Sequence, residues 1–327
     1  MKNSCLLVGD IGGTNARFAL ADAQSPGYSA EKSFECADFP SVEAAITAYL
    51  QAVGASPPKV ICIAAAGPIV NGEVRLTNND WKIDSFELAR AFGGATVQLL
   101  NDFAAIAYSI PYLLPEHRLQ VGHTPLNDLD KAEFTVGIIG PGTGLGAAGL
   151  SKRGEVLLPQ IGEGGHVGFA PETQLQMDVL ARLRDQFDRV SDERLVSGPG
   201  LVNMYRALCH IRAENHLPLD AAGIFRQGSA QLDPTATATV QLFFEILGQV
   251  AGNLALSLGA FDGIYIGGGI VARHPELFIN SPFRTGFERK GRHRSLMERI
   301  PTQLILHPQP GLLGASHCAL ELLQAQE

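Results

Sequence analysis

The chain has 327 residues, of which 46% are hydrophobic and 18% charged, and its formal net charge is −8 at pH 7. This composition excludes a disordered polymer, and the acidic balance argues against nucleic acid as the main partner, because phosphate backbones bind basic surfaces. No run is long enough for a signal peptide or a membrane span. Five scattered cysteines without a CxxC pair favour a reduced, cytoplasmic protein with no membrane partner.

The first third of the chain alternates strand and helix patterns, which is typical of an α/β layer. Strands are expected at 6–8, 17–21, 60–65 and 96–100. Ser41 and Asp84 are expected to cap helices that end at Gly54 and at Gly93–Gly94. A third helix, 103–110, is expected to stop at Pro111.

A second α/β region follows the polar segment 111–130. Its patterns predict strands at 134–139 and 263–266 and a hairpin that turns at 152–154. Asp233-Pro234 predicts the start of a long helix that ends at Gly259. The chain is expected to close with a strand at 304–306, the sequence GLLGA at 311–315 and a short final helix. The length and the two regions favour two domains.

Two glycine-rich turns, GDIGGTN at 9–15 and GPGTG at 140–144, each stand between two strand patterns. A P-loop is excluded because the chain has no Gly-Lys dipeptide. A dinucleotide fingerprint fits 142–147 and would indicate a dehydrogenase, but that turn must open a helix, and a strand follows here. We favour hairpins whose N–H groups bind phosphate, with Thr14 and Thr143 as further donors; plain tight hairpins are the alternative. The repeated pattern suggests a duplicated domain.

Acidic residues stand close to these turns or follow another strand. Asp10 would be repelled by phosphate unless a cation lay between them, which implies Mg²⁺ held through water. Asn101-Asp102 follows a strand, the position at which ligands bind in α/β sheets. Asp102 is a candidate base for a sugar hydroxyl that attacks a phosphoryl group, with Asn101 orienting the hydroxyl. Alternatively, Asp102 is an ordinary N-cap of the helix that starts at Phe103.

The sequence GEGGH at 162–166 places Glu163 and His166 on a glycine-rich backbone, which suits recognition of a polyol. A solvated loop is the alternative, and a metal site lacks further ligands nearby. Glu193 by itself is interpreted as an acid in the first turn of a short helix.

Seven motifs occur in order along essentially the whole chain: GDIGGTNAR (9–17), LNDF (100–103), GPGTGLG (140–146), GEGGHVGF (162–169), ERLVSGPG (193–200), GGGI (267–270) and GLLGA (311–315). Together they resemble the bacterial glucokinase family, the ATP-dependent, zinc-free group of the actin/hexokinase-like superfamily. Neither the cysteine-rich zinc motif of repressor-type sugar kinases nor an N-terminal helix-turn-helix segment is found, so a DNA-binding repressor is not expected.

The resemblance implies a two-domain ribonuclease-H-like α/β fold with an inter-domain cleft. The small domain would comprise 1–110 plus 308–327, and the large domain 111–307. It also implies transfer of the γ-phosphoryl group of MgATP to the 6-hydroxyl of glucose by a homodimer. The rival of another class is a protein that senses sugar and nucleotide without turning them over.

Carried over residue by residue, the resemblance makes Asp102 the general base. The implied glucose contacts are Asn101, Asp102, Glu163, His166 and Glu193. The implied ATP contacts are Gly9, Asp10, Ile11, Gly12, Gly13, Thr14, Gly142, Thr143, Gly267, Gly268 and Gly269. Pro141, which stiffens the second turn, and Gly168, which leaves a bare position after His166, depart from the family pattern.

Overall fold

The computed structural model describes residues 5–76 and 81–326. The chain forms two compact units, Met1–Leu114 with His307–Glu327, and Pro115–Leu306, called here unit 1 and unit 2. Unit 1 therefore extends four residues past the expected boundary at 110 and takes up its C-terminal segment at 307 rather than 308.

Unit 1 is built on a five-stranded sheet with the order β3-β2-β1-β4-β7. β1 pairs antiparallel with β2, and β2 with β3, whereas β1, β4 and β7 run parallel. The strands are β1 Leu6–Ile11, β2 Asn15–Ala21, β3 Tyr28–Glu35, β4 Val60–Ala65 and β7 Thr96–Asn101. A separate two-stranded sheet comprises β5 Glu73–Arg75 and β6 Lys82–Asp84.

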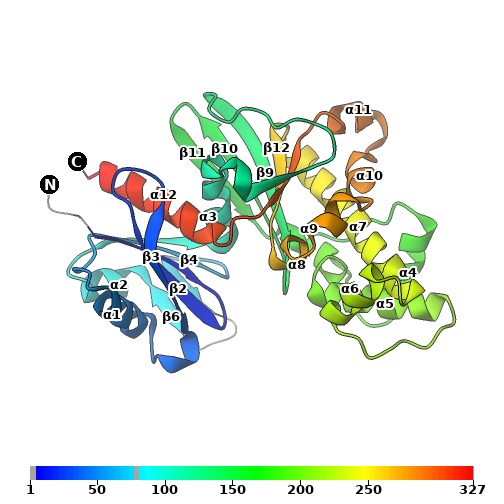
Figure 1. Ribbon diagram of the computed structural model, residues 1–327, viewed down its shortest axis with the longest axis horizontal. Helices are drawn as coiled ribbons and strands as arrows, with labels where there is room; N and C mark the ends of the chain where they lie inside the picture. Colours follow the sequence, from blue (N-terminus) through cyan, green and yellow to red (C-terminus); the bar gives the residue numbers. More distant parts are fainter. Residues whose placement is uncertain (1–4, 77–80, 327) are drawn as a thin grey trace. The chain divides into compact units, whose positions relative to one another are not determined.

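Helices cover both faces of this sheet (Figure 1). Because successive side chains of a strand point to opposite faces, Leu7 and Ile11 of β1 join one apolar cluster and Leu6 and Val8 join another. The first cluster includes α1, Val42–Val53, and α2, Ser85–Ala91; the second includes α3, Asp102–Ser109, and α12, Pro310–Gln324. The C-terminal helix thus completes the core of unit 1.

Unit 2 contains a six-stranded sheet with the order β11-β10-β9-β12-β13-β8. Its strands are β8 Arg118–Val121, β9 Glu133–Pro141, β10 Leu145–Arg153, β11 Val156–Gly162, β12 Gly263–Ile266 and β13 Thr302–Ile305. Its helices are α4 Gln174–Arg184, α5 Gly198–Ile211, α6 Ala221–Ser229, α7 Pro234–Leu258, α8 Gly269–Ala272, α9 Pro275–Ile279, α10 Phe283–Glu288 and α11 Arg294–Met297.

The two sheets share one strand plan. In each, a three-stranded antiparallel meander (β1–β2–β3 or β9–β10–β11) is followed by parallel strands, β4 and β7 or β12 and β13. This repeat explains why the glycine-rich turns at 9–15 and 140–144 look alike, since both join the first two strands of a meander. The arrangement agrees with the α/β, ribonuclease-H-like class that the motifs imply.

The helix ends confirm most of the capping predictions. Ser41 and Asp84 cap α1 and α2, and Asp233 caps α7. Gly54 and Gly259 end their helices in the left-handed conformation.

The expectation for GLLGA is wrong, because these residues form the first turns of α12 instead of preceding it. Gly314 packs so closely on α3 that a Cβ would overlap the Ala105 carbonyl oxygen, which explains a glycine inside the helix.

α7 is the one helix of the described residues that is long and apolar enough to cross a membrane by length and composition. Its side chains, including Phe243, Phe244 and Leu247, are instead buried in the apolar core of unit 2. Buried core helices of globular proteins meet the same criterion, so α7 is explained by its packing.

Candidate active site

The acidic residues of unit 1 gather at one edge of its sheet. Asp10 of β1 is aligned with Ala64 of β4, which is aligned with Leu100 of β7. The carboxyl ends of these parallel strands therefore place Asp10 at the same sheet edge as Asn101 and Asp102, with β4 between β1 and β7. The carboxylate of Asp102 is close enough to raise the pKa of Asp10.

Asn101, not Asp102, is the N-cap of α3. Its Oδ1 accepts hydrogen bonds from the N–H groups of Phe103 (3.0 Å) and Ala104 (3.3 Å). Its Nδ2 donates to the Gly67 carbonyl at 3.4 Å. Asp102 is the first residue of the helix, and its Oδ1 also accepts from Phe103 N at 2.9 Å. The interpretation of Asp102 as an ordinary N-cap is therefore wrong, and Asn101 has a structural task that the sequence analysis did not assign to it.

The electrostatic surroundings of Asp10 favour a bound cation. The pKa of Asp10 is raised to about 6, chiefly by burial; Arg17 lowers it, and the carboxylates of Asp102 and Glu31 raise it. No described residue donates a hydrogen bond to the Asp10 carboxylate. Gly311, at the start of α12, lies against this carboxylate, and a Cβ on Gly311 would lie only 3.3 Å from it. A divalent cation would offset this crowded negative charge.

These residues fit a magnesium ion that is held mainly through water and substrate. The described residues contain no group of three or more His, Cys, Asp and Glu side chains able to hold a metal. Mg²⁺ commonly retains several waters and uses one or two carboxylates together with substrate phosphates. The arrangement of Asp10 and Asp102 suits that mode of binding.

Each glycine-rich turn closes its hairpin with one of its own amides. Gly12 N–H donates to Asn15 O (2.9 Å), and Gly142 N–H donates to Gly144 O (2.8 Å). These two amides are therefore not available to a ligand. In contrast, the N–H groups of Thr14, Thr143 and Gly144 donate to no other described residue. Such unused backbone donors are what an anion site requires.

Unit 2 has a pocket of about 620 Å³ beside its turn. Gly142, Thr143 and Gly269 contribute to it, so the structure brings two of the predicted ATP-binding segments together. Gly268 has φ +85° and lies against Pro141, where a Cβ would overlap the carbonyl oxygen. This close approach joins the turn after β12 to the end of β9.

The sequence analysis missed several residues of this pocket. They are Gly198, Pro199, Val202, Ala221, Ile270 and Arg273. The motif ERLVSGPG contains two of them, but it suggested a role only for Glu193. Val202 and Ala221 lie in α5 and α6, Ile270 ends the motif GGGI in α8, and Arg273 directly follows α8. No local pattern indicates that these elements face one cavity.

The expected sugar-binding residues of unit 2 lie on two short 3₁₀ segments. Glu163 precedes the segment Gly164–His166, and its side chain is 71% exposed; that of His166 is 58% exposed, with Nε2 4.0 Å from Glu163 Oε2. Glu193 lies in the segment Asp192–Arg194, as its local pattern predicts, and its Oε2 accepts from Leu145 N at 2.9 Å. A bridge between Gly168 and Ser191 joins the two segments.

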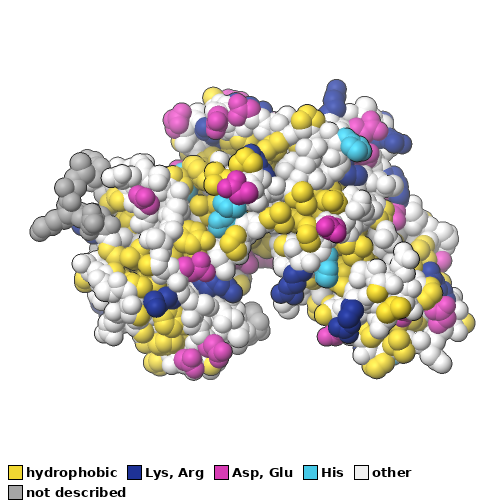
Figure 2. Space-filling view, viewed as in Figure 1, with side chains coloured by type: hydrophobic (Ala, Val, Ile, Leu, Met, Phe, Trp, Pro, Cys, Tyr) yellow, Lys and Arg dark blue, Asp and Glu magenta, His cyan; other side chains and the backbone are white. Residues whose placement is uncertain are grey.

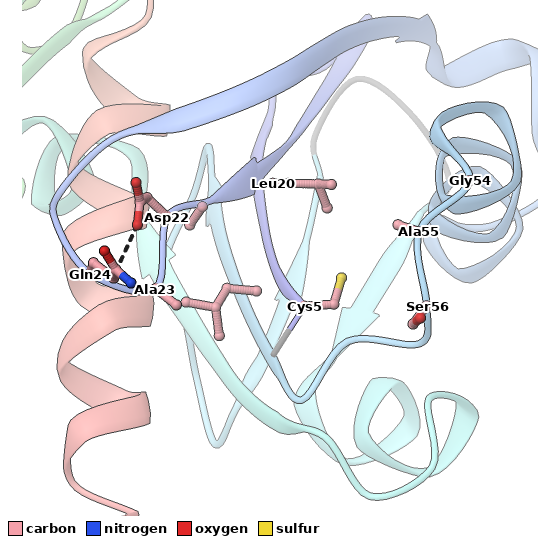
Figure 3. A pocket seen from close by; sticks show the side chains of 10 residues that line it. Cys5, Leu20, Asp22, Ala23, Gln24, Gly54, Ala55 and Ser56 are labelled. Atoms are coloured by element: carbon pink, nitrogen blue, oxygen red, sulfur yellow. Dashed lines mark hydrogen bonds between the residues drawn. The ribbon is translucent and has the colours of Figure 1, made fainter. Parts of the chain in front are cut away.

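Unit 1 has a pocket of about 460 Å³ away from the acidic edge (Figure 3). It lies at the opposite end of β1, where Cys5 and Leu6 begin the strand, and it is completed by Gly54–Ser56 after α1. Its Asp22 accepts a hydrogen bond from Gln24 N at 2.7 Å within the same turn. None of the predicted site residues lines it.

On the face shown in Figure 2, Lys and Arg side chains are interspersed with Asp and Glu and do not gather into one patch. The two sheets share one strand plan, and each carries a glycine-rich turn between its first two strands; these features define an α/β protein of the actin/hexokinase-like class.

Comparison with known proteins gives the family. The glucokinase family model matches residues 7–322. The chain is 42% identical to a glucokinase of Tolumonas auensis over 312 residues, 95% of each chain. It is 41% identical to a glucokinase of Xanthomonas campestris pv. campestris over 324 residues, 98% of this chain and 96% of the relative. A crystal structure of a glucokinase from an Antarctic psychrotroph superposes with a TM-score of 0.90 at 34% identity, covering 98% of this chain and all of that one. The chain belongs to the glucokinase family, which confirms the resemblance.

Proposed function

We propose that the chain transfers the γ-phosphoryl group of MgATP to the 6-hydroxyl of glucose, giving glucose 6-phosphate and ADP. Membership of the glucokinase family over 7–322 supports the choice of substrates. The observation that carries the chemistry is the pair of carboxylates, Asp10 and Asp102, at the carboxyl edge of the unit 1 sheet.

In this proposal Asp102 is the general base. Its carboxylate accepts the proton of the 6-hydroxyl as the oxygen bonds to the γ-phosphorus and the bond to the ADP oxygen breaks. The cap that Asn101 provides fixes the first turn of α3 and so positions Asp102. Asn101, Glu163, His166 and Glu193 would bind the sugar hydroxyls.

ATP would bind to the segments Gly9–Thr14, Gly142–Thr143 and Gly267–Gly269. The unused N–H groups of Thr14 and Thr143 support phosphate binding, and the pocket of about 620 Å³ supports binding of the remainder of the nucleotide. Mg²⁺, when bound, would offset the charge of the phosphates, with Asp10 holding its water ligands. Closure of a cleft between the domains would exclude water from the reaction.

The remaining parts of the proposal are cellular and quaternary. We place the enzyme in the cytoplasm, in keeping with its free cysteines Cys5, Cys36, Cys62, Cys209 and Cys318. The resemblance implies a homodimer, which light scattering after size exclusion would test.

A coupled ADP-release assay with MgATP and a panel of sugars tests the reaction. We expect kcat/KM to be highest for glucose, ahead of mannose, fructose and glucosamine. A protein that binds glucose and ATP calorimetrically but releases no ADP above the rate of the Asp102→Asn variant would contradict the proposal and favour the sensor alternative. Thermal protection by NAD⁺ but not by ATP would favour the dehydrogenase alternative.

A further inference from the structure

The first residue of β10, Leu145, is held from two sides in unit 2. Its N–H donates to Glu193 Oε2 at 2.9 Å. On the other side lies Gly165 of the 162–168 segment, called here the sugar loop because Glu163 and His166 are expected to bind sugar. Gly165 packs so tightly that a Cβ would overlap the Leu145 carbonyl oxygen. The backbone of this one residue therefore contacts two segments expected to bind sugar, and the residue directly follows the turn expected to bind phosphate.

The two oxygens of the Glu193 carboxylate have different surroundings. Oε2 makes a charge-assisted hydrogen bond to the backbone of Leu145, which is a strong and short-ranged interaction. Oε1 accepts no hydrogen bond from any residue in the described ranges 5–76 and 81–326. This carboxylate can hold the turn with one oxygen and a sugar hydroxyl with the other.

The same segment also supports the other end of the turn. Gly198 N–H donates to Gly142 O at 2.9 Å. Ser197 links the two supports, because its Oγ donates to Glu193 O (2.7 Å) and accepts from Gly200 N (3.0 Å) at the start of α5. Residues 142–145 are thus tied to residues 193–198 at both ends, with the N–H groups of Thr143 and Gly144 left unused between the ties.

We propose that Glu193 is a positioning residue for the nucleotide as well as a sugar ligand, and that sugar binding orders the 142–145 turn through the Glu193–Leu145 hydrogen bond. The inference rests on the proposed function of these two segments. A sugar hydroxyl on Oε1 restricts the carboxylate, which in turn restricts Leu145 and the unused amides beside it. The 142–145 turn then loses less conformational entropy when the nucleotide binds. Because such coupling is reciprocal, nucleotide also tightens sugar binding by the same factor.

Gly144 gives a specific way to break this link. A Cβ at position 144 would lie 2.5 Å from Glu193 Oε2, and the backbone there is not left-handed, so Gly144→Ala displaces the carboxylate without straining the chain. Gly162→Ala is the matched control, since its Cβ would have no neighbour within 4 Å and it directly precedes Glu163.

The measurement is the calorimetric Kd of the Mg²⁺ complex of a non-hydrolysable ATP analogue, with and without saturating glucose. In the wild type and in Gly162→Ala we expect glucose to lower this Kd by about 5–150-fold, the usual range of coupling between sites. In Gly144→Ala the ratio should fall towards one. An unchanged ratio in folded Gly144→Ala would overturn the inference, because coupling by domain closure alone would survive this substitution.

A second variant keeps the test decisive if Gly144→Ala does not fold. Glu193→Asp is one methylene shorter, so its carboxylate cannot reach Leu145 N and the sugar together, and the ratio should again fall towards one; retention of the full wild-type ratio would overturn the inference. The ADP-release assay separates this result from the proposed function. A wild type that phosphorylates glucose but shows no coupling contradicts only the inference, whereas one that binds both ligands without turnover contradicts the function.

Discussion

The β1–β2 turn of unit 1 and the β9–β10 turn of unit 2 occupy equivalent places in two sheets of the same strand plan. They differ in charge and in support. The first turn follows Asp10 and stands at an edge shared with Asp102, whereas the second has no acid of its own and is held by Glu193 and Gly198. We infer that the two copies of this strand plan have different roles in catalysis. Unit 1 supplies the base and the link to the cation, and unit 2 supplies a supported nest for the nucleotide.

The largest expected effect comes from removing the base of unit 1. Asp102→Asn keeps the size of the side chain but cannot accept the hydroxyl proton, so kcat should fall by about 10²–10⁴-fold. Glucose affinity measured by calorimetry should change little, because an amide still hydrogen-bonds a hydroxyl. Near-wild-type turnover with glucose still bound would remove unit 1 from the chemistry and would invalidate the comparison.

Asp10 should have the next largest effect. Asp10→Ala is expected to lower kcat/KM for MgATP by about 10–100-fold, the usual cost of losing a group that holds a metal through its outer shell. Glucose binding should be affected much less, since no sugar contact is assigned to this side chain. Titration of Mg²⁺ at fixed ATP measures the effect, and an equal loss for both substrates would argue that Asp10 serves only the fold.

Gly268→Ala tests the close contact in unit 2 between Gly268, after β12, and Pro141, at the end of β9. The added Cβ would overlap the Pro141 carbonyl oxygen at a residue whose φ is +85°, so we expect the free energy of unfolding to fall by about 1–3 kcal/mol in urea denaturation. Gly267→Ala is the control, because its Cβ would lie 3.9 Å from Ile305 and its backbone is not left-handed. Equal losses in both variants would mean that the close contact is not specific to Gly268.

Local patterns of the sequence predicted the elements of both units well, because caps and periodicity act over one or two turns. Val60–Ala65 and Gly263–Ile266 have the predicted bounds, and Ser41, Asp233 and Gly259 take their expected roles. What could not be predicted depends on contacts between distant segments. The repeated fold, for example, was only suggested by two similar turns until the pairing of β4 with β1 and of β12 with β9 was known.

The site shows the same limit. The motifs named Asp102, Glu163, His166 and Glu193, and these proposed roles stay predictions. Asn101 caps α3 in place of Asp102 because the helix starts one residue earlier than the sequence predicts. The bond from Glu193 to Leu145 joins residues 48 positions apart. No local signal could indicate that a first-turn acid also holds a hairpin.

Each unit also contains a carboxyl group whose pKa is raised mainly by burial. In unit 2 it is Asp192, 5% exposed, which lines a pocket of about 290 Å³ with Gly164 and Gly168 of the sugar loop. Its N–H donates to Val167 O at 2.9 Å. Burial raises the pKa of Asp192 to about 7, although Arg189 and Lys290 oppose the shift. Unlike Asp10, it has no second acid among the causes of its shift, so its effect should be on stability and not on the cation.

The smallest expected effect is therefore a pH-dependent change in stability. A raised pKa means that the contribution of Asp192 is fully present below its ordinary value of 3.8 and is lost as the pH rises through about 7. Asp192→Asn keeps the shape without the ionisation, so Tm of the variant minus Tm of the wild type should grow between pH 5.5 and 7 and level off by pH 8.5. Asp188→Asn removes the same charge at an exposed neighbour, and subtracting its profile isolates the part due to burial. Parallel profiles for the two variants would show that the Asp192 pocket admits enough water to solvate the carboxylate, and the contrast with Asp10 would then rest on the acid pair alone.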